Sequence, residues 1–359
     1  MPQGLSFTAS VDSIAAANVS LTDMAAQSRS AGGGKSSMRL RTLNLVVRCD
    51  SEEHHAHALE LISRLSGAHP SRTIFVLAGS PGGPPIRATV ARECEERSDR
   101  ILCYDLVSVE TGIDAVDHLN SVVQPLLVSH LPVCLWWVGE PAFSHDAFEQ
   151  LAVLSHSVII DSQCFVDAQS DLIELDRLLG LGRTRIVDLN WQRTGIWREL
   201  IAQMFSSAEA ASRLPDVSTV AVVCDGGHPM QALLTLGWLA SRLAWTVEEG
   251  VVLLGSGEPG TPRAIELRVE RGGAEDGTLA SVRLVTSAGG TATFTMDRSG
   301  DDLVTSIEGD GLPGLSRTNR IAWPSEADLL RRSMSVRAQD AIFANAVHAA
   351  AKIAPLLQQ

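Results

Sequence analysis

Hydrophobic residues near the start of the chain form short, nearly continuous runs separated by amphipathic stretches. The runs RTLNLVVRC (41–49) and SRTIFVLAG (71–79) are typical of strands buried on both faces of a sheet. A helix capped by Ser51 is predicted between them. Its apolar stripe consists of Ala58, Leu61, Ile62 and Leu65. This β-α-β opening predicts parallel pairing, because two parallel strands need a crossover connection.

The alternation of strands and helices continues through the first half of the chain. Further strands are predicted at 87–94, 100–109, 132–139, 157–161 and 185–191. Helices are predicted from Thr111 with a kink at Pro125, at 144–155, up to Gly180, and from Thr194. The helix from Thr194 has an apolar stripe of Trp197, Leu200, Ile201, Met204 and Phe205. This order predicts an N-terminal α/β domain with a largely parallel sheet.

The pattern changes in the second half, where strand-like segments alternate with a period of two. A strand at 218–224 precedes a helix at 230–245 that is apolar almost all round and is therefore expected to be buried. The segments 264–270 and 291–296 alternate apolar and polar residues, which is typical of antiparallel strands with one face in water. A long helix capped at Ser325 is expected to close the chain. This half is predicted to be an α+β domain with an antiparallel meander.

Composition divides the chain further. Residues 1–37 are rich in Ser, Ala and Gly and are expected to form a mobile leader, with a short helix starting near Thr22. The α/β domain is expected at 38–205 and the α+β domain at 218–359. The polar, small residues of 206–217 are the expected linker.

Charge and cysteine content exclude several classes of partner. The formal net charge of the 359 residues is −13, so nucleic acids and anionic membranes are disfavoured. No apolar run approaches the roughly 18 residues that a membrane span needs. Residues 1–37 do not read as a secretory signal. The six cysteines form no CxxC motif and no regular spacing, and a cytoplasmic location is expected.

No catalytic, cofactor-binding or metal-binding constellation is evident. Three glycine-rich stretches, at 78–85, 224–229 and 255–260, lack the GxGxxG pattern and the Walker lysine. Of these, CDGGHP (224–229) lies best for an anion, between a strand and a helix, although a capped turn explains it as well. HHAH (54–57) lacks a third metal ligand and favours a solvated helix face. There is no GxSxG nucleophile elbow.

Two cysteines remain candidates for redox chemistry. Cys94 lies in the charged segment ARECEERSD and is expected to be the most exposed of the six, while Cys103 lies in the next strand. A thiol switch formed by this pair is one open hypothesis. Inert, buried thiols are the alternative, as expected for the other cysteines in apolar strands.

Six segments carry a resemblance to a known family. They are NLVVRCD (44–50), HPSRTIFVLAG (69–79), LPVCLWWVGEPAF (131–143), SVIIDSQCF (157–165), DLNWQRTGIWRELIAQMF (188–205) and LLTLGWLASRLAW (233–245). In order, content and spacing they resemble the glucose-6-phosphate dehydrogenase assembly protein family, often called OpcA. The strands at 263–310 and the leader have the least family character.

The resemblance implies a protein that is not an enzyme and needs no cofactor. Members bind glucose-6-phosphate dehydrogenase, promote its active oligomer and raise its activity in the oxidative pentose phosphate pathway. The resemblance to cyanobacterial members also implies thioredoxin as a second partner, through cysteines. The alternatives are a small-ligand or nucleotide-binding α/β protein, acting as sensor or enzyme, and a thiol-dependent redox adaptor.

Two strand ends are the candidate partner-binding surface. Ligand sites of parallel sheets lie at the carboxyl ends of the strands, and tryptophan is enriched at interface hot spots. The candidate residues are Trp136, Trp137, Glu140, Asn190, Trp191 and Arg193. Adjacent strand residues point to opposite faces, so one tryptophan of the 136–137 pair is expected in the core and the other under a helix or at the surface.

Overall fold

The computed structural model describes residues 5–31, 36–38, 42–65, 71–78, 86–97, 100–112, 118–143, 145–224, 228–248, 250–254, 263–272, 278–287 and 290–357. The chain divides into two compact units. The first comprises 1–161, 182–187 and 326–337, and the second comprises 162–181, 188–325 and 338–359. The linker expected at 206–217 therefore lies inside the second unit, where it carries helix α8 (Ala208–Ala211), 3₁₀ helix η4 (Leu214–Asp216) and the start of a strand.

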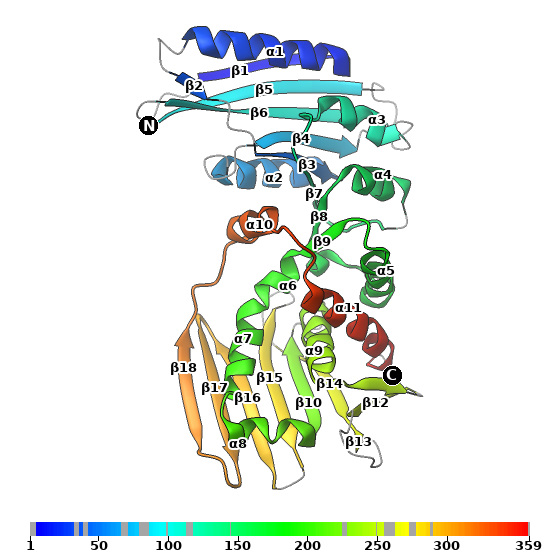
Figure 1. The fold of residues 1–359 in the computed structure, drawn as a ribbon, viewed down its shortest axis with the longest axis vertical. Helices are drawn as coiled ribbons and strands as arrows, with labels where there is room; N and C mark the ends of the chain where they lie inside the picture. The colour runs from blue at the N-terminus through cyan, green and yellow to red at the C-terminus, as the bar shows by residue number, and fades with distance from the viewer. Residues whose placement is uncertain are drawn as a thin grey trace. The chain divides into compact units, whose positions relative to one another are not determined.

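The first unit is built on a largely parallel sheet, as expected (Figure 1). Its described strands are β1 (Leu5–Val11), β2 (Ser36–Met38), β3 (Leu43–Cys49), β4 (Ser71–Ala78), β5 (Ile86–Arg97), β6 (Arg100–Thr111), β7 (Val133–Trp137), β8 (Ser157–Ile160) and β9 (Arg185–Asp188). They lie in the order β1-β5-β6-β4-β3-β7-β8-β9, with β2 beside β6. The pairs β3–β4, β3–β7, β4–β6 and β7–β8 are parallel.

Helices cover this sheet as the apolar periodicity predicts. Helix α2 (Glu52–Leu65) begins after Ser51, whose Oγ accepts a hydrogen bond from the His54 amide at 3.1 Å. The stripe predicted for it is the buried face. Helices α4 (Asp146–Leu154) and α10 (Glu326–Met334) also belong to the unit, and α10 packs against α2. None of the helices in the described ranges is both long and apolar enough to cross a membrane.

The described residues of the stretch expected as a mobile leader, 5–31 and 36–37, add two strands and a helix to this unit. Strand β1 pairs antiparallel with β5, and helix α1 (Ile14–Ala31) packs on the same strand. The buried residues of α1 are Ala17, Leu21, Met24, Ala25 and Ser28. These positions are mostly three or four residues apart, which is a helical stripe. Small residues make this stripe weakly apolar, so composition concealed it.

A buried ion cluster joins three strands of the sheet. Asp105 of β6 lies opposite Arg92 of β5 and Arg72 of β4 in the strand register. Its carboxylate accepts from Arg92 Nε at 2.7 Å and from Arg72 Nη2 at 3.2 Å. Arg92 and Asp105 are 1% and 0% exposed. Arg72, which the sequence left open as a ligand-recognising residue, thus serves the fold of the sheet, where it also donates to the Leu126 carbonyl.

The long helix expected from Thr111 is not found there, because Thr111 ends β6. Residues 113–117 lie outside the described part of the chain. The next described elements are a short helix α3 (Leu119–Val123) and a 3₁₀ helix η2 (Gln124–Leu126). Pro125 lies in the first turn of η2. A backbone N–H at this position would have no acceptor within the helix, so proline costs no hydrogen bond there.

The second unit contains the meander. Its main sheet has the order β14-β10-β15-β16-β17-β18. The strands are β10 (Val217–Cys224), β14 (Glu266–Arg271), β15 (Leu279–Thr286), β16 (Ala292–Ser299), β17 (Asp302–Gly309) and β18 (Leu315–Arg320). A small sheet consists of β11 (Thr246–Glu248), β12 (Val251–Leu254) and β13 (Arg263–Ala264). The prediction that 264–270 pairs antiparallel was wrong, because β14 runs parallel to β10. Alternation reports which face is buried and not the direction of the neighbouring strand.

Two helices of the second unit, α7 (Gly195–Met204) and α9 (Met230–Arg242), pack on the main sheet, and their predicted burial is confirmed. Helix α11 (Ala341–Ile353) packs on α9 and on α5 (Ala168–Leu181). The remaining helical segments, besides α8 and η4, are η3 (Ser162–Cys164), α6 (Leu189–Arg193) and η5 (Ala354–Leu356). The long helix expected at the C-terminus is instead two helices, α10 and α11. Asp340 caps the second by accepting from the Ile342 and Phe343 amides.

Candidate functional site: a filled crevice and a capped helix

The first unit has the topology in which a ligand site is expected. From β3 the sheet proceeds through β4 and β6 on one side and through β7, β8 and β9 on the other. The strand order therefore reverses between β3 and β7. In doubly wound sheets, dinucleotides bind in the crevice outside the carboxyl ends of the strands at this switch point. In this chain, side chains from β3, β7 and α2 lie close together at these strand ends.

Arg48 closes the crevice from the end of β3. Its side chain is buried, and its Nη1 lies 2.9 Å from Asp50 Oδ1 and also donates to the Cys49 carbonyl. The guanidinium carbon lies 5.4 Å from the centroid of the Trp137 ring on the neighbouring strand. Burial lowers the pKa of Arg48, and the nearby Asp50 carboxylate opposes that effect. Burial likewise raises the pKa of the Cys49 thiol to about 12, so this thiol is inert.

The turn after β7 closes over the same place. Trp137 Nε1 donates to the Glu140 carbonyl at 2.8 Å and so holds the turn against the strand end. Gly139 has a φ of +84°, and a Cβ at this position would lie 2.7 Å from Cε1 of His54. Glycine is required by both the conformation and the contact. His54, from the first turn of α2, thus fills the space beside the turn.

The described residues of this crevice lack the features by which a dinucleotide is held. Its pyrophosphate would need a glycine-rich turn and free amides at a helix N-terminus. Here the turn reads Cys49-Asp50-Ser51, and the first turn of α2 carries the carboxylates of Glu52 and Glu53. These acidic groups repel phosphate. The described ends of β3 and β7 thus differ from those of a dinucleotide-binding sheet.

The paired tryptophans are both core residues. Trp136 and Trp137 are each 2% exposed, and they lie on a strand with neighbours on both sides. The Trp137 ring also packs on Phe148 of α4, with 5.3 Å between the ring centroids. Of the two alternatives for the second tryptophan, a place under a helix is the one observed. Helices cover both faces of a doubly wound sheet, so alternate side chains are equally buried. Glu140 is exposed.

The second candidate strand end is a helix. The predicted strand 185–191 stops at Asp188, whose carboxylate accepts from the amides of Asn190 and Trp191 at 3.0 and 3.1 Å. Asp188 is therefore the N-cap of α6. The same carboxylate accepts from the amide and hydroxyl of Ser162 at 2.9 and 2.8 Å. The apolar run alone could not reveal that its aspartate was a cap.

Asn190 belongs to a buried hydrogen-bond network. It is 0% exposed, and its Nδ2 donates to Ser162 Oγ at 3.2 Å. Its Oδ1 accepts from Gln231 Nε2 at 2.9 Å, and Gln231 Oε1 accepts from the Leu279 amide at 3.0 Å. The network links η3, α6, α9 and β15. Its polar atoms are used within the fold and do not face a partner.

Trp191 anchors α11 through its indole. Its Nε1 donates to Asp340 Oδ2 at 3.0 Å, and the Arg198 guanidinium lies 3.3 Å from its ring centroid. Desolvation lowers the pKa of Arg198 to about 10, partly offset by the carboxylates of Asp340 and Asp188. Arg193 is partly buried in the last turn of α6. Of the six candidate partner-binding residues, four are thus buried, and direct contact is left to Glu140 and Arg193.

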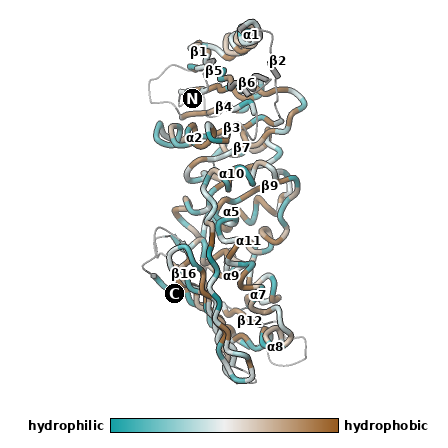
Figure 2. The backbone as a smooth tube through the Cα atoms, turned by 90° about the vertical axis from the view of Figure 1, so that its left-hand side faces the viewer, coloured by the Kyte–Doolittle hydropathy of each residue, from teal (hydrophilic) through white to brown (hydrophobic). Residues whose placement is uncertain are grey.

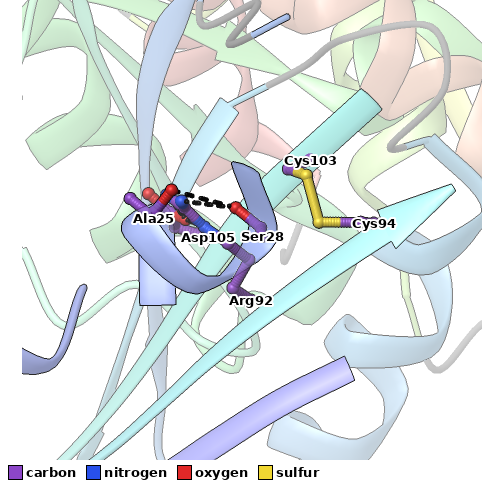
Figure 3. Close-up of a disulfide and its surroundings, with 6 residues drawn as sticks. All are labelled: Ala25, Ser28, Arg92, Cys94, Cys103 and Asp105. Atoms are coloured by element: carbon purple, nitrogen blue, oxygen red, sulfur yellow. Dashed lines mark hydrogen bonds and ion pairs between the residues drawn. A yellow bond between two sulfur atoms is a disulfide. The ribbon is translucent and has the colours of Figure 1, made fainter. Parts of the chain in front are cut away.

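Cys94 and Cys103 form a disulfide. They lie directly opposite each other on β5 and β6, with 4.1 Å between the Cα atoms (Figure 3). Cys94 is 3% exposed, so the expectation of an exposed thiol was wrong. Its side chain points to one face of β5 while that of the charged neighbour Glu93 points to the other. The other four cysteines, Cys49, Cys134, Cys164 and Cys224, are not disulfide-bonded.

The remaining motifs add no site. Within the described ranges no group of three or more His, Cys, Asp or Glu residues could hold a metal ion. His57 of the HHAH motif pairs with Glu326 at 3.0 Å, and His55 pairs with Ser108 Oγ at 3.2 Å. Residues 79–85, 225–227 and 255–262 are outside the described part of the chain. The anion site suggested at 224–229 therefore stays a prediction.

The chain is similar to solved structures only at a coarse level. The transcriptional regulator Gal80p of Kluyveromyces lactis is 8% identical with a TM-score of 0.44, over 82% of this chain and 79% of that one. Scyllo-inositol dehydrogenase of Lactobacillus casei is 9% identical with a TM-score of 0.42, over 89% and 97%. Overlap this coarse does not indicate a shared function.

Sequence comparisons are more specific. The OxPP cycle protein OpcA of Nostoc punctiforme is 34% identical over 182 residues, which are 49% of this chain and 38% of that protein. OpcA of Synechococcus elongatus is 31% identical over 180 residues, which are 49% and 40%. The matched region thus spans about two fifths of each relative's length.

Family-level similarity covers both units. The glucose-6-phosphate dehydrogenase subunit N-terminal domain matches residues 62–177, and the corresponding C-terminal domain matches residues 184–347. Together these ranges include five of the six resembling segments in whole or in part. The chain belongs to the OpcA family of glucose-6-phosphate dehydrogenase assembly proteins.

Proposed function

We propose that this chain is a non-catalytic assembly factor that binds glucose-6-phosphate dehydrogenase, favours its active oligomer and so supports the oxidative pentose phosphate pathway. The observation that carries the non-catalytic part is the filled crevice. A doubly wound sheet has its ligand site at the switch point between β3 and β7, and there Arg48 lies against the Trp137 ring and His54 lies against Gly139. The family assignment supports the choice of partner.

The physical requirement for such activity is modest. An assembly factor shifts an oligomer equilibrium only by the difference between its affinities for the two forms. A tenfold shift needs about 1.4 kcal/mol of difference. One well-packed contact at an interface supplies that much, so a few surface residues suffice.

The test is a dehydrogenase assay at sub-saturating glucose 6-phosphate with enzyme from the same organism. Titration of this chain is expected to lower the apparent KM or raise the rate, and the two proteins are expected to co-elute in size-exclusion chromatography. Absence of both effects, in oxidising and in reducing buffer, would reject the proposed function.

Glu140 is the exposed candidate residue at the end of β7, and its charge is predicted to matter for the complex. Glu140→Lys is expected to weaken binding of the dehydrogenase by about tenfold, in the range of a moderate interface contact. The turn itself should persist, because Trp137 bonds the Glu140 backbone and not its side chain. Asp23→Lys, an exposed reversal on α1, is the matched control. Equal binding by both variants would remove this turn from the interface.

The disulfide favours a second candidate function, a redox adaptor whose thiols control partner binding. Reduction would break the Cys94–Cys103 bond and add two electrons and two protons, giving two thiols between β5 and β6. A dithiol reductant of the thioredoxin class would supply the two electrons and two protons and would itself become a disulfide. If this function holds, activation of the dehydrogenase differs between oxidised and reduced protein, and the Cys94→Ser, Cys103→Ser double variant loses that difference. Identical activation in both states rejects the adaptor and leaves the assembly factor intact.

A further inference from the structure

One face of the six-stranded sheet in the second unit is covered and the other is not. Figure 2 shows α7 and α9 on one side of this sheet, and no described helix of the unit packs on the opposite side. The covered side includes the fully buried Val220, Val282, Phe294 and Leu303. Since side chains alternate, their sequence neighbours point to the uncovered face.

The inner strands of that uncovered face carry mostly short side chains, and its long charged side chains are Arg283 near the centre and Glu266, Arg268 and Glu270 on the edge strand β14. Its central positions are Thr219, Ala221, Val223, Ser281, Val285, Thr293, Thr295, Val304 and Ser306. Eight of these nine are only partly exposed, and Thr295 is buried. Apart from Arg283, these inner strands present short side chains, over which another sheet can approach to the usual spacing of about 10 Å.

Charges of both signs lie on this face without partners. Arg283 stands near its centre, between Ala221 and Thr295 on the flanking strands, and is exposed. No ion pair or hydrogen bond of its side chain is found within the described residues, and the same holds for Asp297 and Glu308 nearer the rim. A two-fold axis that passes between Arg283 and these carboxylates, and not through Arg283, would bring the cation of each copy opposite a carboxylate of the other.

The size of the face suits a dimer. Six strands at about 4.8 Å spacing and about 20 Å of strand length give roughly 500 Å² on each copy. Two copies would bury about 1,000 Å², which meets the lower bound for a specific interface.

We propose that the uncovered face of the β14-β10-β15-β16-β17-β18 sheet binds a second copy of this chain, sheet against sheet, in a two-fold homodimer. A second copy brings a sheet face with the same short inner side chains and with charges of both signs that can pair across the two-fold axis. The proposal is independent of the dehydrogenase, since it concerns the chain alone.

The experiment is light scattering coupled to size-exclusion chromatography of the full chain over a wide concentration range. The wild type is expected to dimerise. Arg283→Glu, which reverses the charge near the centre of the face, and Ala221→Arg, which inserts a long side chain there, are each expected to raise the dimer dissociation constant at least about tenfold. Arg242→Glu is the matched control, an exposed reversal at the end of α9, and should dimerise like the wild type.

Three results would overturn the proposal. The wild type could be a monomer at every concentration, or its dimer could tolerate both face variants. Alternatively, hydrogen exchange could show strands β15 and β16 protected by the dehydrogenase and not by self-association, which would make the face a site for that partner. Thermal unfolding of each variant confirms that a lost dimer does not reflect a lost fold.

Discussion

Replacing Asp105 by asparagine is expected to destabilise the first unit by about 3–5 kcal/mol. The carboxylate lies between Arg92 and Arg72 on adjacent strands, at 2.5 and 3.2 Å, and is completely buried. The variant would leave two guanidinium groups in the sheet without a counter-ion. The cost of an unpaired buried charge is far greater than the net value of an exposed pair.

Urea unfolding followed by tryptophan fluorescence measures this effect for the first unit, which holds Trp136 and Trp137. Glu60→Gln is the matched control, because Glu60 pairs with Arg64 on the exposed side of α2. It should change stability by no more than about 0.5 kcal/mol. A loss below about 1 kcal/mol for Asp105→Asn would show that the cluster is hydrated and that its three charges are not buried together.

Adding one methyl group at Gly237 is expected to cost about 3 kcal/mol, at the upper end for an overpacked core. Gly237 lies in α9 where α11 crosses it. A Cβ at this position would clash with the Ala346 carbonyl oxygen and would lie 2.8 Å from the Ala350 amide nitrogen. These are backbone atoms, so no rotamer change relieves the clash and the two helices must separate.

Gly180→Ala is the control for Gly237→Ala. Gly180 is also helical, but nothing lies within 4 Å of the Cβ that would be added. Alanine there should stabilise the protein by up to about 1 kcal/mol, because it restricts the unfolded chain. The expected result is therefore two glycine-to-alanine changes of opposite sign in the thermal midpoint. A neutral Gly237→Ala would mean that α9 and α11 do not cross closely.

The buried elements were readable from hydrophobic pattern because burial determines that pattern directly. The strand 41–49, the helix stripe of Ala58, Leu61, Ile62 and Leu65, and the buried helix at 230–245 all appear close to their predicted places. The hydrophobic pattern failed to predict a buried element where small residues stood in place of large apolar ones. The leader was the main case, because its Ala-rich stripe packs well on β5 but has little apolar area per residue.

Candidate site residues were harder to place than elements. Tryptophan and asparagine are equally suited to interfaces and to cores, and only the neighbours distinguish the two. Trp191 is held by Asp340, which is 149 residues away in the sequence, and Asn190 by Gln231. Asp188 offered one usable signal, since an aspartate before a run that continues into a helix is a common N-cap.

By itself, the sequence determined the family, the two classes of architecture and the buried faces of most helices and strands, since local periodicity and distinctive motifs carry that information. Only the tertiary structure decided which strands are neighbours, that β14 runs parallel to β10, that Cys94 and Cys103 are bonded, and that the tryptophans are core. These properties depend on pairings between residues far apart in the chain or on alternative strand registers, and the free energies that select them come from packing and desolvation across those pairings.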